Sequence, residues 1–264
     1  MISKNQIKFV KQLEMKKYRQ REGLFVAEGP KVVGDLLAAG FEPHAIFATE
    51  EWKSLSLQNN SLTSQRLRVG ASAGILSPLT TPVSPDELRK LSFLQHPQQV
   101  LAVFRLPSHT KSQISNLKSQ IILALDGIQD PGNLGTIIRI ADWFGIDSIV
   151  CSLDTADAWS PKVVQATMGS IARVKISYTD LKEYLSHSTL PVCGTLLDGS
   201  NIYTQELPQE AIIVMGNEGN GISPDIRQLV THRLLIPQYR PGAESLNVAI
   251  ATAITCAEFR RRSI

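Results

Sequence analysis

The chain contains few cysteines and no cysteine cluster. Of its 264 residues three are cysteine, and Cys151, Cys193 and Cys256 lie far apart, without a Cys-x-x-Cys pair or a Cys/His group. We therefore expect neither a structural metal nor a disulfide framework. No uninterrupted apolar run reaches the roughly 20 residues that span a membrane, and the N-terminal segment has no apolar signal region. These absences favour a cytoplasmic protein without membrane contact.

Two common phosphate-binding motifs are also missing. No Gly-x-x-x-x-Gly-Lys-Ser/Thr loop is present, and no Gly-x-Gly-x-x-Gly follows the first strand predicted in the second half of the chain. A nucleotide-like ligand would therefore bind in another way. The net charge of +3 is mildly basic, which is compatible with a polyanionic partner without requiring one.

The composition predicts an ordinary globular protein with two domains. Hydrophobic residues make up 43% and charged residues 19% of the chain, whose length suffices for two cores. Residues 106–119 are rich in Ser, Lys, Asn and Gln, which predicts a linker between a domain at 1–105 and a domain at 120–264.

The first domain is predicted to be a small α/β domain. Gly40 is expected to end a helix, and Ser84 with Glu87 forms a capping-box pattern at the start of another. The polar stretch 56–66 predicts a mobile loop. We expect helices over 3–17, 31–39 and 84–91, and strands over 24–29, 45–48 and 99–104.

The second domain shows a regular alternation of strands and helices without an internal repeat. This alternation predicts an α/β fold in which a parallel sheet is covered on both faces. Strands are expected at 121–126, 148–152, 173–176, 191–196, 211–216 and 233–237, and helices at 133–144, 160–169, 179–186, 223–230 and 245–262.

Three segments of this domain carry the most information about function. Residues 126–139, 214–223 and 236–249 each contain or follow an apolar strand-like run that gives way to a loop rich in Gly, Asn and acidic residues. Glycine lets a backbone approach a ligand closely. Because open α/β sheets bind ligands at the carboxyl ends of their strands, three such loops predict one shared site.

Each polar residue in these segments also has a purely structural interpretation. Asn133 and Ser245 could each cap a helix, and the loop around Glu218 could be a surface turn. Arg139 could be an ordinary paired arginine or a fork that holds a phosphate. No histidine lies in the three segments and Ser245 has no evident partner base, which disfavours covalent hydrolysis.

The last predicted helix is apolar around its whole circumference. Such a helix needs cover on more than one side, so it is either buried deep in the domain or packed against a second copy of the chain. It ends in Arg260, Arg261 and Arg262, which complement the helix dipole and offer a contact to an RNA backbone.

On these three segments, in this order, residues 120–262 resemble the SpoU family of RNA ribose methyltransferases in the SPOUT superfamily. The first domain, through Tyr18, Arg19 and residues 23–26 and 28–31, is similar to the family's RNA-binding N-terminal domain with a ribosomal-protein-like fold. The resemblance implies a deep trefoil knot in the second domain, a homodimer and S-adenosylmethionine as the cofactor, with no metal.

The resemblance also implies roles for individual residues. The catalytic set would be Asn133, Arg139, Glu218, Ser245 and Asn247. The cofactor-binding set would be Thr195, Leu196, Gly216, Asn217, Glu218, Gly219, Ile236 and Leu246. Residues 238–244 depart from the family pattern, since the connection is about one residue longer and contains Arg240 and Pro241.

The implied activity is transfer of a methyl group to a ribose 2′-hydroxyl of RNA. Ribosomal RNA is the expected substrate, because the first domain resembles that of ribosomal RNA modifiers, and transfer RNA is the alternative. A non-catalytic RNA-binding module with the same fold, or another nucleotide-using α/β enzyme, are rival hypotheses. Measurable affinity for S-adenosylmethionine distinguishes the enzyme from either rival.

Overall fold

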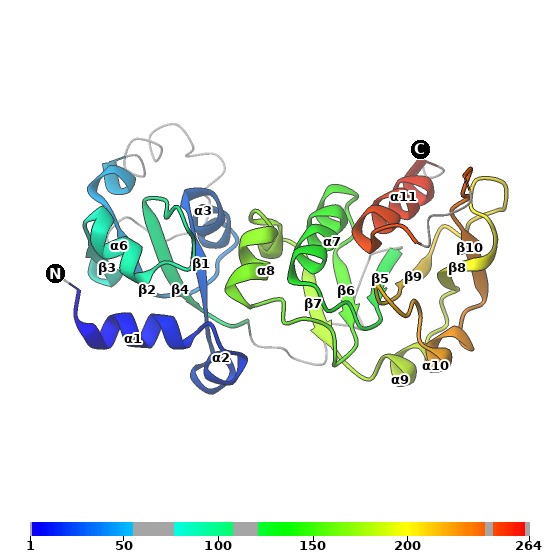
Figure 1. Cartoon of the computed structure of the whole chain (residues 1–264), viewed down its shortest axis with the longest axis horizontal. Helices are drawn as coiled ribbons and strands as arrows, with labels where there is room; N and C mark the ends of the chain where they lie inside the picture. The colour runs from blue at the N-terminus through cyan, green and yellow to red at the C-terminus, as the bar shows by residue number, and fades with distance from the viewer. Residues whose placement is uncertain (1, 55–76, 108–120, 241–244, 262–264) are drawn as a thin grey trace. The chain divides into compact units, whose positions relative to one another are not determined.

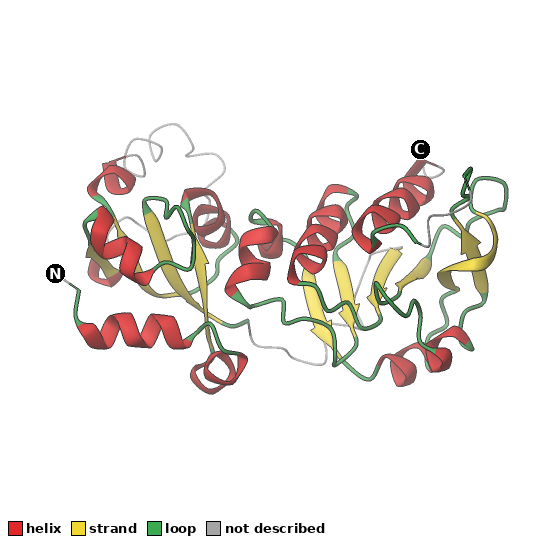
Figure 2. Cartoon of the chain, in the orientation of Figure 1, coloured by secondary structure: helices red, strands yellow, loops and turns green. Residues whose placement is uncertain are grey.

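The computed structural model describes residues 2–54, 77–107, 121–240 and 245–261. The chain divides into two compact units (Figures 1 and 2). The N-terminal unit contains Met1–Ser108 together with Trp159–Ala172, and the C-terminal unit contains His109–Ala158 and Arg173–Ile264.

The N-terminal unit is built on a four-stranded sheet in the order β1-β4-β2-β3. Strands β1 and β2 each run antiparallel to β4, and β3 runs parallel to β2. The elements are α1 (Lys4–Gln12), α2 (Lys16–Glu22), β1 (Leu24–Glu28), α3 (Pro30–Ala38), β2 (Pro43–Ala48), η1 (Ser77–Leu79), β3 (Thr80–Pro82), α6 (Pro85–Leu91) and β4 (Val100–Arg105).

Most local predictions for this unit are confirmed. Gly40 has a φ of 84° just after α3, and the Ser84–Glu87 capping box is formed at the start of α6. The strand β3 was not predicted, and the loop predicted at 56–66 lies outside the described residues.

The prediction of one helix over 3–17 is wrong, because the chain breaks between α1 and α2. The side chain of Arg19 is buried and its Nη1 donates to the carbonyl oxygens of Leu13 and Glu14 at 2.8 and 2.6 Å. These carbonyls lie just beyond α1, where backbone oxygens lack helical partners. The long-range partner therefore stabilises a helix end that periodicity does not show.

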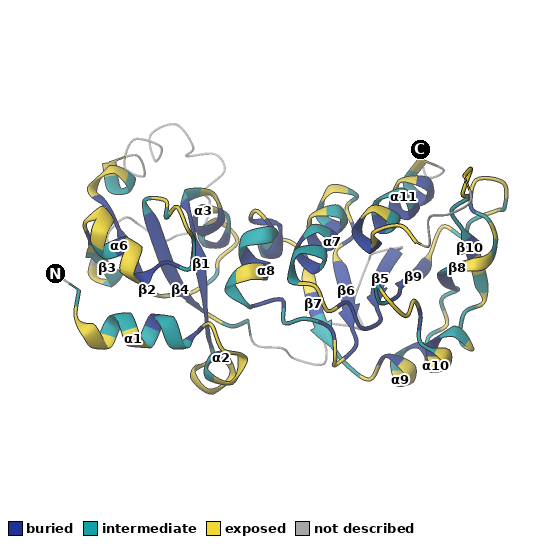
Figure 3. Cartoon of the chain, viewed as in Figure 1, coloured by how far each residue is buried: buried dark blue, intermediate teal, exposed yellow. Residues whose placement is uncertain are grey.

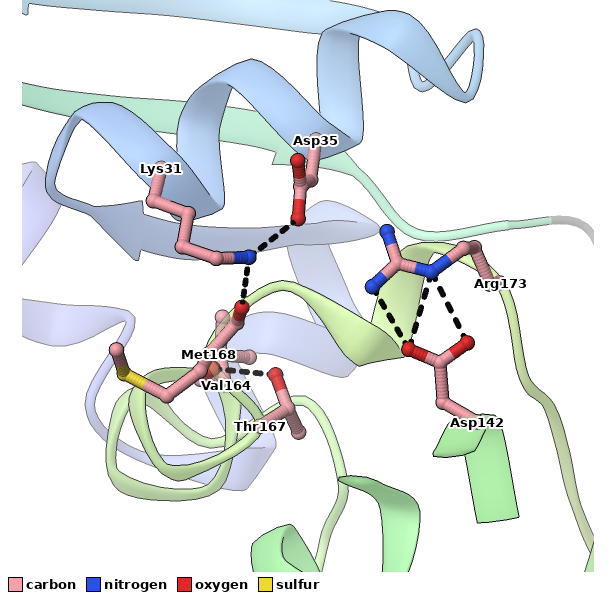
Figure 4. A network of polar contacts seen from close by, with 7 residues as sticks. All are labelled: Lys31, Asp35, Asp142, Val164, Thr167, Met168 and Arg173. Carbon is pink, nitrogen blue, oxygen red and sulfur yellow. Dashed lines mark hydrogen bonds and ion pairs between the residues drawn. The ribbon is translucent and has the colours of Figure 1, made fainter. Parts of the chain in front are cut away.

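Residues 159–172 join the N-terminal unit through two sets of contacts, a grouping that the sequence did not predict. The helix α8 (Pro161–Ala166) packs against β1, and the Trp159 ring lies 4.7 Å from that of Phe25. Lys31 Nζ donates to the Met168 carbonyl at 2.7 Å and to Asp35 at 2.9 Å (Figure 4). The segment ends in η3 (Ser170–Ala172).

The C-terminal unit contains a six-stranded sheet in the order β10-β8-β9-β5-β6-β7. Every neighbouring pair is parallel, which confirms the predicted parallel sheet. The elements are β5 (Ile121–Leu125), α7 (Pro131–Trp143), β6 (Ser148–Cys151), β7 (Lys175–Tyr178), α9 (Leu181–Ser186), β8 (Val192–Asn201), β9 (Ala211–Met215), α10 (Pro224–Arg227), β10 (His232–Leu235) and α11 (Val248–Arg261).

Helices cover both faces of this sheet, as predicted. Leu185 of α9 and Ile226 of α10 pack in one core cluster with alternate residues of β5 and β9, such as Ile122 and Val214. The helices α7 and α11 pack together on the other side, and Figure 3 shows the strands between the layers as buried. Because both faces are covered, the central strands are continuously apolar.

The last helix α11 is covered on one side within the chain. Thr252, Cys256 and Phe259 are buried, whereas Ile250 is 53% exposed. Arg260 donates to the carbonyl oxygens of Phe144 and Gly145 at the end of α7, at 2.7 and 2.8 Å. Arg260 lies in the last turn of α11, as the predicted dipole role requires, and it also caps the neighbouring helix α7.

The side chain next to Arg260 has a different partner. Arg261 donates to Glu258 one turn earlier on α11, at 2.7 and 2.9 Å. Arg262 lies outside the described residues. Among the helices of the described part of the chain, none is long and apolar enough to cross a membrane.

Candidate active site

The predicted site residues follow strands that are neighbours in the sheet. Leu125 at the end of β5 pairs directly with Met215 at the end of β9. The next residues, Asp126 and Gly216, therefore begin two loops at the same edge of the sheet. This edge is the carboxyl end of the parallel strands, where open α/β sheets bind ligands.

Asp130, and not Asn133, caps the helix α7. The Asp130 side chain accepts a hydrogen bond from the backbone N–H of Asn133 at 2.8 Å. The interpretation of Asn133 as the helix cap is therefore wrong. Since Asn133 lies within the first turn, its amide side chain is free to bind other loops.

Asn133 joins the three predicted segments by hydrogen bonds. Its Nδ2 donates to Glu218 Oε1 at 2.9 Å, and its Oδ1 accepts from Asn247 Nδ2 at 3.0 Å. These partners are 85 and 114 residues away in the sequence. The structure therefore brings Asn133, Glu218 and Asn247 together as one chain of side chains, as the single-site prediction requires.

The loop after β9 is a tight turn at this sheet edge. Asn217 and Gly221 exchange two backbone hydrogen bonds of 2.9 Å, and Asn217 Nδ2 donates to the Gly127 carbonyl at 2.7 Å. A Cβ on Gly216 would lie 2.2 Å from the carbonyl carbon of Gly221. The segment is thus a surface turn and also a loop placed to contact a ligand. Glycine is required at position 216 because the backbone of Gly221 lies too close for a side chain.

Asp126 lies at this sheet edge, and the predicted sets did not include it. It is 8% exposed, and its Oδ2 accepts from the backbone N–H of Ser223 at 2.7 Å. This bond ties the loop after β5 to the start of α10. The signal in the sequence was an acidic residue directly after a buried strand, where a carboxylate needs a partner.

Asn247 caps the helix α11, whereas Ser245 does not. Asn247 Oδ1 accepts from the backbone N–H groups of Ala249 and Ile250 at 3.0 and 3.3 Å, so one amide binds its own helix and Asn133. The interpretation of Ser245 as the cap is therefore wrong, and Ser245 is exposed. Residues 241–244 of the longer connection lie outside the described residues.

Arg139 is not part of this hydrogen-bonded chain. It is exposed on α7, six residues beyond Asn133. No described side chain forms an ion pair with it, so the interpretation as an ordinary paired arginine is not supported. A free guanidinium on this helix is available to an anionic ligand.

Cysteine chemistry does not contribute to this site. Burial raises the pKa of Cys193 in β8 and of Cys256 in α11 to about 12 in each case. Burial also raises the pKa of Cys151. All three remain neutral thiols at physiological pH, and a thiol is a poor nucleophile.

The predicted cofactor residues lie within β8 and in the loops that follow β9 and β10. Thr195 Oγ1 in β8 contacts Met215 Sδ of β9 at 3.7 Å, and Leu196 is buried beside it. Ile236 follows β10 and is half-buried, whereas Leu246 is 51% exposed. Apolar side chains and open backbone groups here suit the adenosine part of a ligand.

The charge of this set fits a cationic ligand. Of the eight predicted cofactor residues, Glu218 alone carries a charge, and it is negative. S-adenosylmethionine bears a positive sulfonium. A nearby carboxylate attracts this cation, whereas it would repel a negatively charged phosphate. The residues present therefore fit this cofactor. Among the described residues, no group of His, Cys, Asp and Glu has the arrangement of a metal site.

Comparison with known proteins identifies the class. The model of the SpoU rRNA methylase family matches residues 120–257, and that of the MRM3-like substrate binding domain matches residues 4–102. The chain belongs to the SpoU rRNA methylase family, which confirms the resemblance found in the sequence.

Relatives match along nearly the whole chain. The 23S rRNA (guanosine(2553)-2′-O)-methyltransferase RlmP of Bacillus subtilis is 31% identical, over 98% of this chain and 97% of its own. The AdoMet-bound rRNA methyltransferase of Sinorhizobium meliloti is 28% identical with a TM-score of 0.83, covering 100% and 97% of the two chains. A TrmH-family protein of Porphyromonas gingivalis is 39% identical with a TM-score of 0.83, covering 99% of both.

Proposed function

We propose that this protein transfers a methyl group from S-adenosylmethionine to a ribose 2′-hydroxyl of ribosomal RNA. One observation carries the proposal: the hydrogen-bonded chain of Asn133, Glu218 and Asn247 unites the three family segments at the carboxyl edge of the sheet. The relatives named above support the reaction and the substrate class.

The chain's own residues position the substrate and the group that takes its proton. The cofactor supplies a methyl group that the positive sulfur already activates. A ribose hydroxyl is a weak nucleophile until it loses its proton, so positioning and proton removal are the remaining tasks. We assign RNA phosphate binding to Arg139. Because arginine stays protonated, the phosphate that it holds takes the hydroxyl proton.

The other polar residues organise the loops around the reacting atoms. Asn133 and Asn247 fix the first and third segments, and Ser245 adds a hydroxyl to the nucleotide side of the site. Glu218, which accepts from Asn133, holds its loop and would supply the negative charge that favours a bound sulfonium. Gly216, Ile236 and Leu246 form the cofactor pocket, with main-chain groups of Thr195, Leu196, Asn217, Glu218 and Gly219.

The residues at 1–105 bind the substrate RNA, 106–119 link the domains and 120–264 carry out methyl transfer. The first 22 residues contain seven basic and two acidic side chains, a net charge of +5, whereas the whole chain carries +3. Lys4, Lys8, Lys16 and Lys17 are exposed on α1 and α2. Such a surface binds phosphates and makes RNA affinity depend on salt.

The working form is a cytoplasmic homodimer with a trefoil knot in the second domain. The half-exposed apolar side chains Leu246 and Ile250, near and on the first turn of α11, support a second copy as cover for this face. The likeness to SpoU-family folds along the whole chain supports the knot. Three free, buried cysteines are compatible with a reducing compartment.

Methyl transfer with pure protein tests the proposal. We expect labelled methyl to pass from S-adenosylmethionine to unmodified ribosomal RNA, and Arg139→Ala to abolish transfer while calorimetry shows nearly unchanged cofactor binding. Arg139→Lys keeps the charge but loses the planar fork, so it should retain partial activity. Normal turnover by Arg139→Ala would refute the role of Arg139. Mapping 2′-O-methyl groups in total RNA with and without the gene identifies the nucleotide. If the methyl group that is lost lies in transfer RNA, then transfer RNA and not ribosomal RNA is the substrate.

A further inference from the structure

Two cations of the helix α2 lie over one aromatic ring. The ammonium nitrogen of Lys17 is 5.0 Å and the guanidinium carbon of Arg21 is 4.8 Å from the centre of the Tyr18 ring. An aromatic face attracts a cation that lies within about 6 Å of its centre. Both cations are exposed while the ring is half-buried, and Figure 3 shows most of α2 as exposed. The ring therefore holds two positive charges close together at the surface.

Helix stability does not explain this arrangement. Lys17 and Arg21 are four residues apart, and like charges at that spacing on a helix repel each other. Lys16 and Lys17 occupy the first turn of α2, where the helix dipole disfavours cations. On α1, Lys4 and Lys8 are exposed and repeat the spacing of four residues. A bound polyanion would relieve the repulsion in both helices.

Two other cations of these helices have structural partners. Lys11 Nζ donates to the Ser92 carbonyl and lies 4.6 Å from the centre of the Phe93 ring. Arg19 is buried and donates to carbonyl oxygens just beyond α1. These two cations therefore stabilise the fold and are not available to a ligand. The remaining cations of α1 and α2 are exposed, and they are Lys4, Lys8, Lys16, Lys17 and Arg21.

Carboxylates leave most of the exposed cations uncompensated. In the described part of the chain no carboxylate forms an ion pair with any of the four lysines. Arg21 has one acidic partner, because its Nε donates to Glu22 Oε1 at 2.8 Å and its Nη2 lies 2.7 Å from the same oxygen. Its Nη1 has no partner among the described residues. Glu22 and the ring thus fix the guanidinium plane and leave one edge of it available to an anion.

We infer that Lys17 and Arg21 form a phosphate clamp, which Tyr18 positions and which binds the backbone of the substrate RNA. Tyr18 is a positioning residue, since its ring holds the two cations without contacting the phosphate. Lys4 and Lys8 extend the same basic surface along α1, so a polyanion fits this surface better than a single phosphate.

The clamp orients the RNA and does not read its sequence. Phosphate contacts fix the register of a nucleic acid on a protein without carrying sequence information. The identity of the polyanion as RNA rests on the proposed function. The match of residues 4–102 to a substrate binding domain includes both basic helices and supports the inference.

The salt dependence of RNA binding tests the clamp. The affinity of the full chain for a ribosomal RNA fragment is measured by fluorescence anisotropy over a series of salt concentrations, without cofactor. Each phosphate contact contributes about 0.7–0.9 to the slope of log K against log salt, so the double variant Lys17→Gln, Arg21→Gln should lower the slope by about 1.5. The control Arg89→Gln removes a cation that Asp86 already pairs at 2.8 Å and should leave the slope unchanged. An unchanged slope in the double variant would overturn the inference.

The variants Tyr18→Phe and Tyr18→Leu test the positioning role. Phenylalanine keeps the aromatic face and should keep the KM for RNA, whereas leucine keeps apolar bulk without that face. For Tyr18→Leu we expect the KM for RNA to rise about fivefold, which corresponds to about 1 kcal/mol, with kcat and cofactor affinity unchanged. A wild-type KM in Tyr18→Leu, or an equal rise in both variants, would show that the ring does not position the cations.

The two proposals fail in different ways. Wild-type protein that shows this salt dependence but transfers no methyl would refute the proposed function and leave the clamp in place. Active wild-type protein whose double variant keeps the slope would refute the clamp and leave methyl transfer in place. Phosphatidylserine vesicles offer a different polyanionic surface. If the double variant lost binding to these vesicles and kept its RNA affinity, the clamp would belong to a membrane contact and the inference would be wrong.

Discussion

The hydrogen bond between Asn133 and Glu218 yields the sharpest prediction, because it joins segments that are 85 residues apart. A bond to a charged acceptor contributes about 1.5–3 kcal/mol when buried. Both residues are half-buried, so water screens the bond and we expect about 1 kcal/mol. Replacing asparagine by alanine in a helix stabilises the helix by about 0.5 kcal/mol, which offsets part of the loss.

The double-mutant cycle of Asn133→Ala and Glu218→Ala isolates this bond from the helix effect. We expect a coupling energy of about 1 kcal/mol, well above the roughly 0.3–0.5 kcal/mol by which independent changes deviate from additivity. A ligand stabilises the unit that binds it. The thermal transition whose midpoint temperature rises when S-adenosylmethionine is added therefore reports unfolding of the C-terminal unit. Unfolding free energies taken from this transition give the cycle.

A control pair uses the same loop. Asn220 lies two residues after Glu218 and its side chain makes no hydrogen bond to another described residue, so Asn133→Ala and Asn220→Ala should be additive. Cofactor affinity should fall in Asn133→Ala and stay unchanged in Asn220→Ala, because the first change alone loosens the loop. If the Asn133–Glu218 pair were also additive, the bond would not hold the segments together and the three loops would not form one coupled site.

Three further changes test other parts of the fold. Gly216→Ala places a Cβ 2.2 Å from Gly221, so the unfolding free energy should drop by about 1–3 kcal/mol and calorimetry should show weaker cofactor binding. Arg19→Met leaves the carbonyl of Leu13 buried without a donor and should lower the unfolding free energy by about 2 kcal/mol, measured by urea titration. Burial raises the pKa of Glu28 above its ordinary 4.5, so the native state holds this proton more tightly than the unfolded state. The stability that this proton confers is complete below pH 4.5 and is lost as pH rises through the pKa of Glu28 in the native state. Because glutamine does not titrate, Glu28→Gln should lose less stability than wild type between pH 4.5 and 7.

These three changes have separate refuting outcomes. Unchanged cofactor affinity in Gly216→Ala would mean that the loop tolerates a side chain. Wild-type stability in Arg19→Met would show that water or another donor satisfies the end of α1. Equal pH dependence in Glu28→Gln and wild type would show that burial does not control this carboxyl group.

The sequence alone predicted most of the elements and the parallel sheet of the second domain, since these depend on neighbours in the chain, but it missed β3 and the break between α1 and α2. Apolar runs alternating with helical patterns predicted the parallel sheet, and the glycine-rich loops predicted a site at its carboxyl edge. The sequence also predicted the helix end at Gly40 and the Ser84–Glu87 capping box, because both depend on residues close together in the chain. The ordered segments also sufficed to place the chain in its family.

Only the tertiary structure decided which groups meet. Asn133 was a plausible helix cap until Asp130 was found to cap α7, which leaves the Asn133 side chain to bind Glu218 and Asn247. Likewise, Arg260 caps a helix 115 residues away. Such partners depend on which strands lie side by side and which loops those strands bring together. The separation of two residues along the chain does not determine this arrangement.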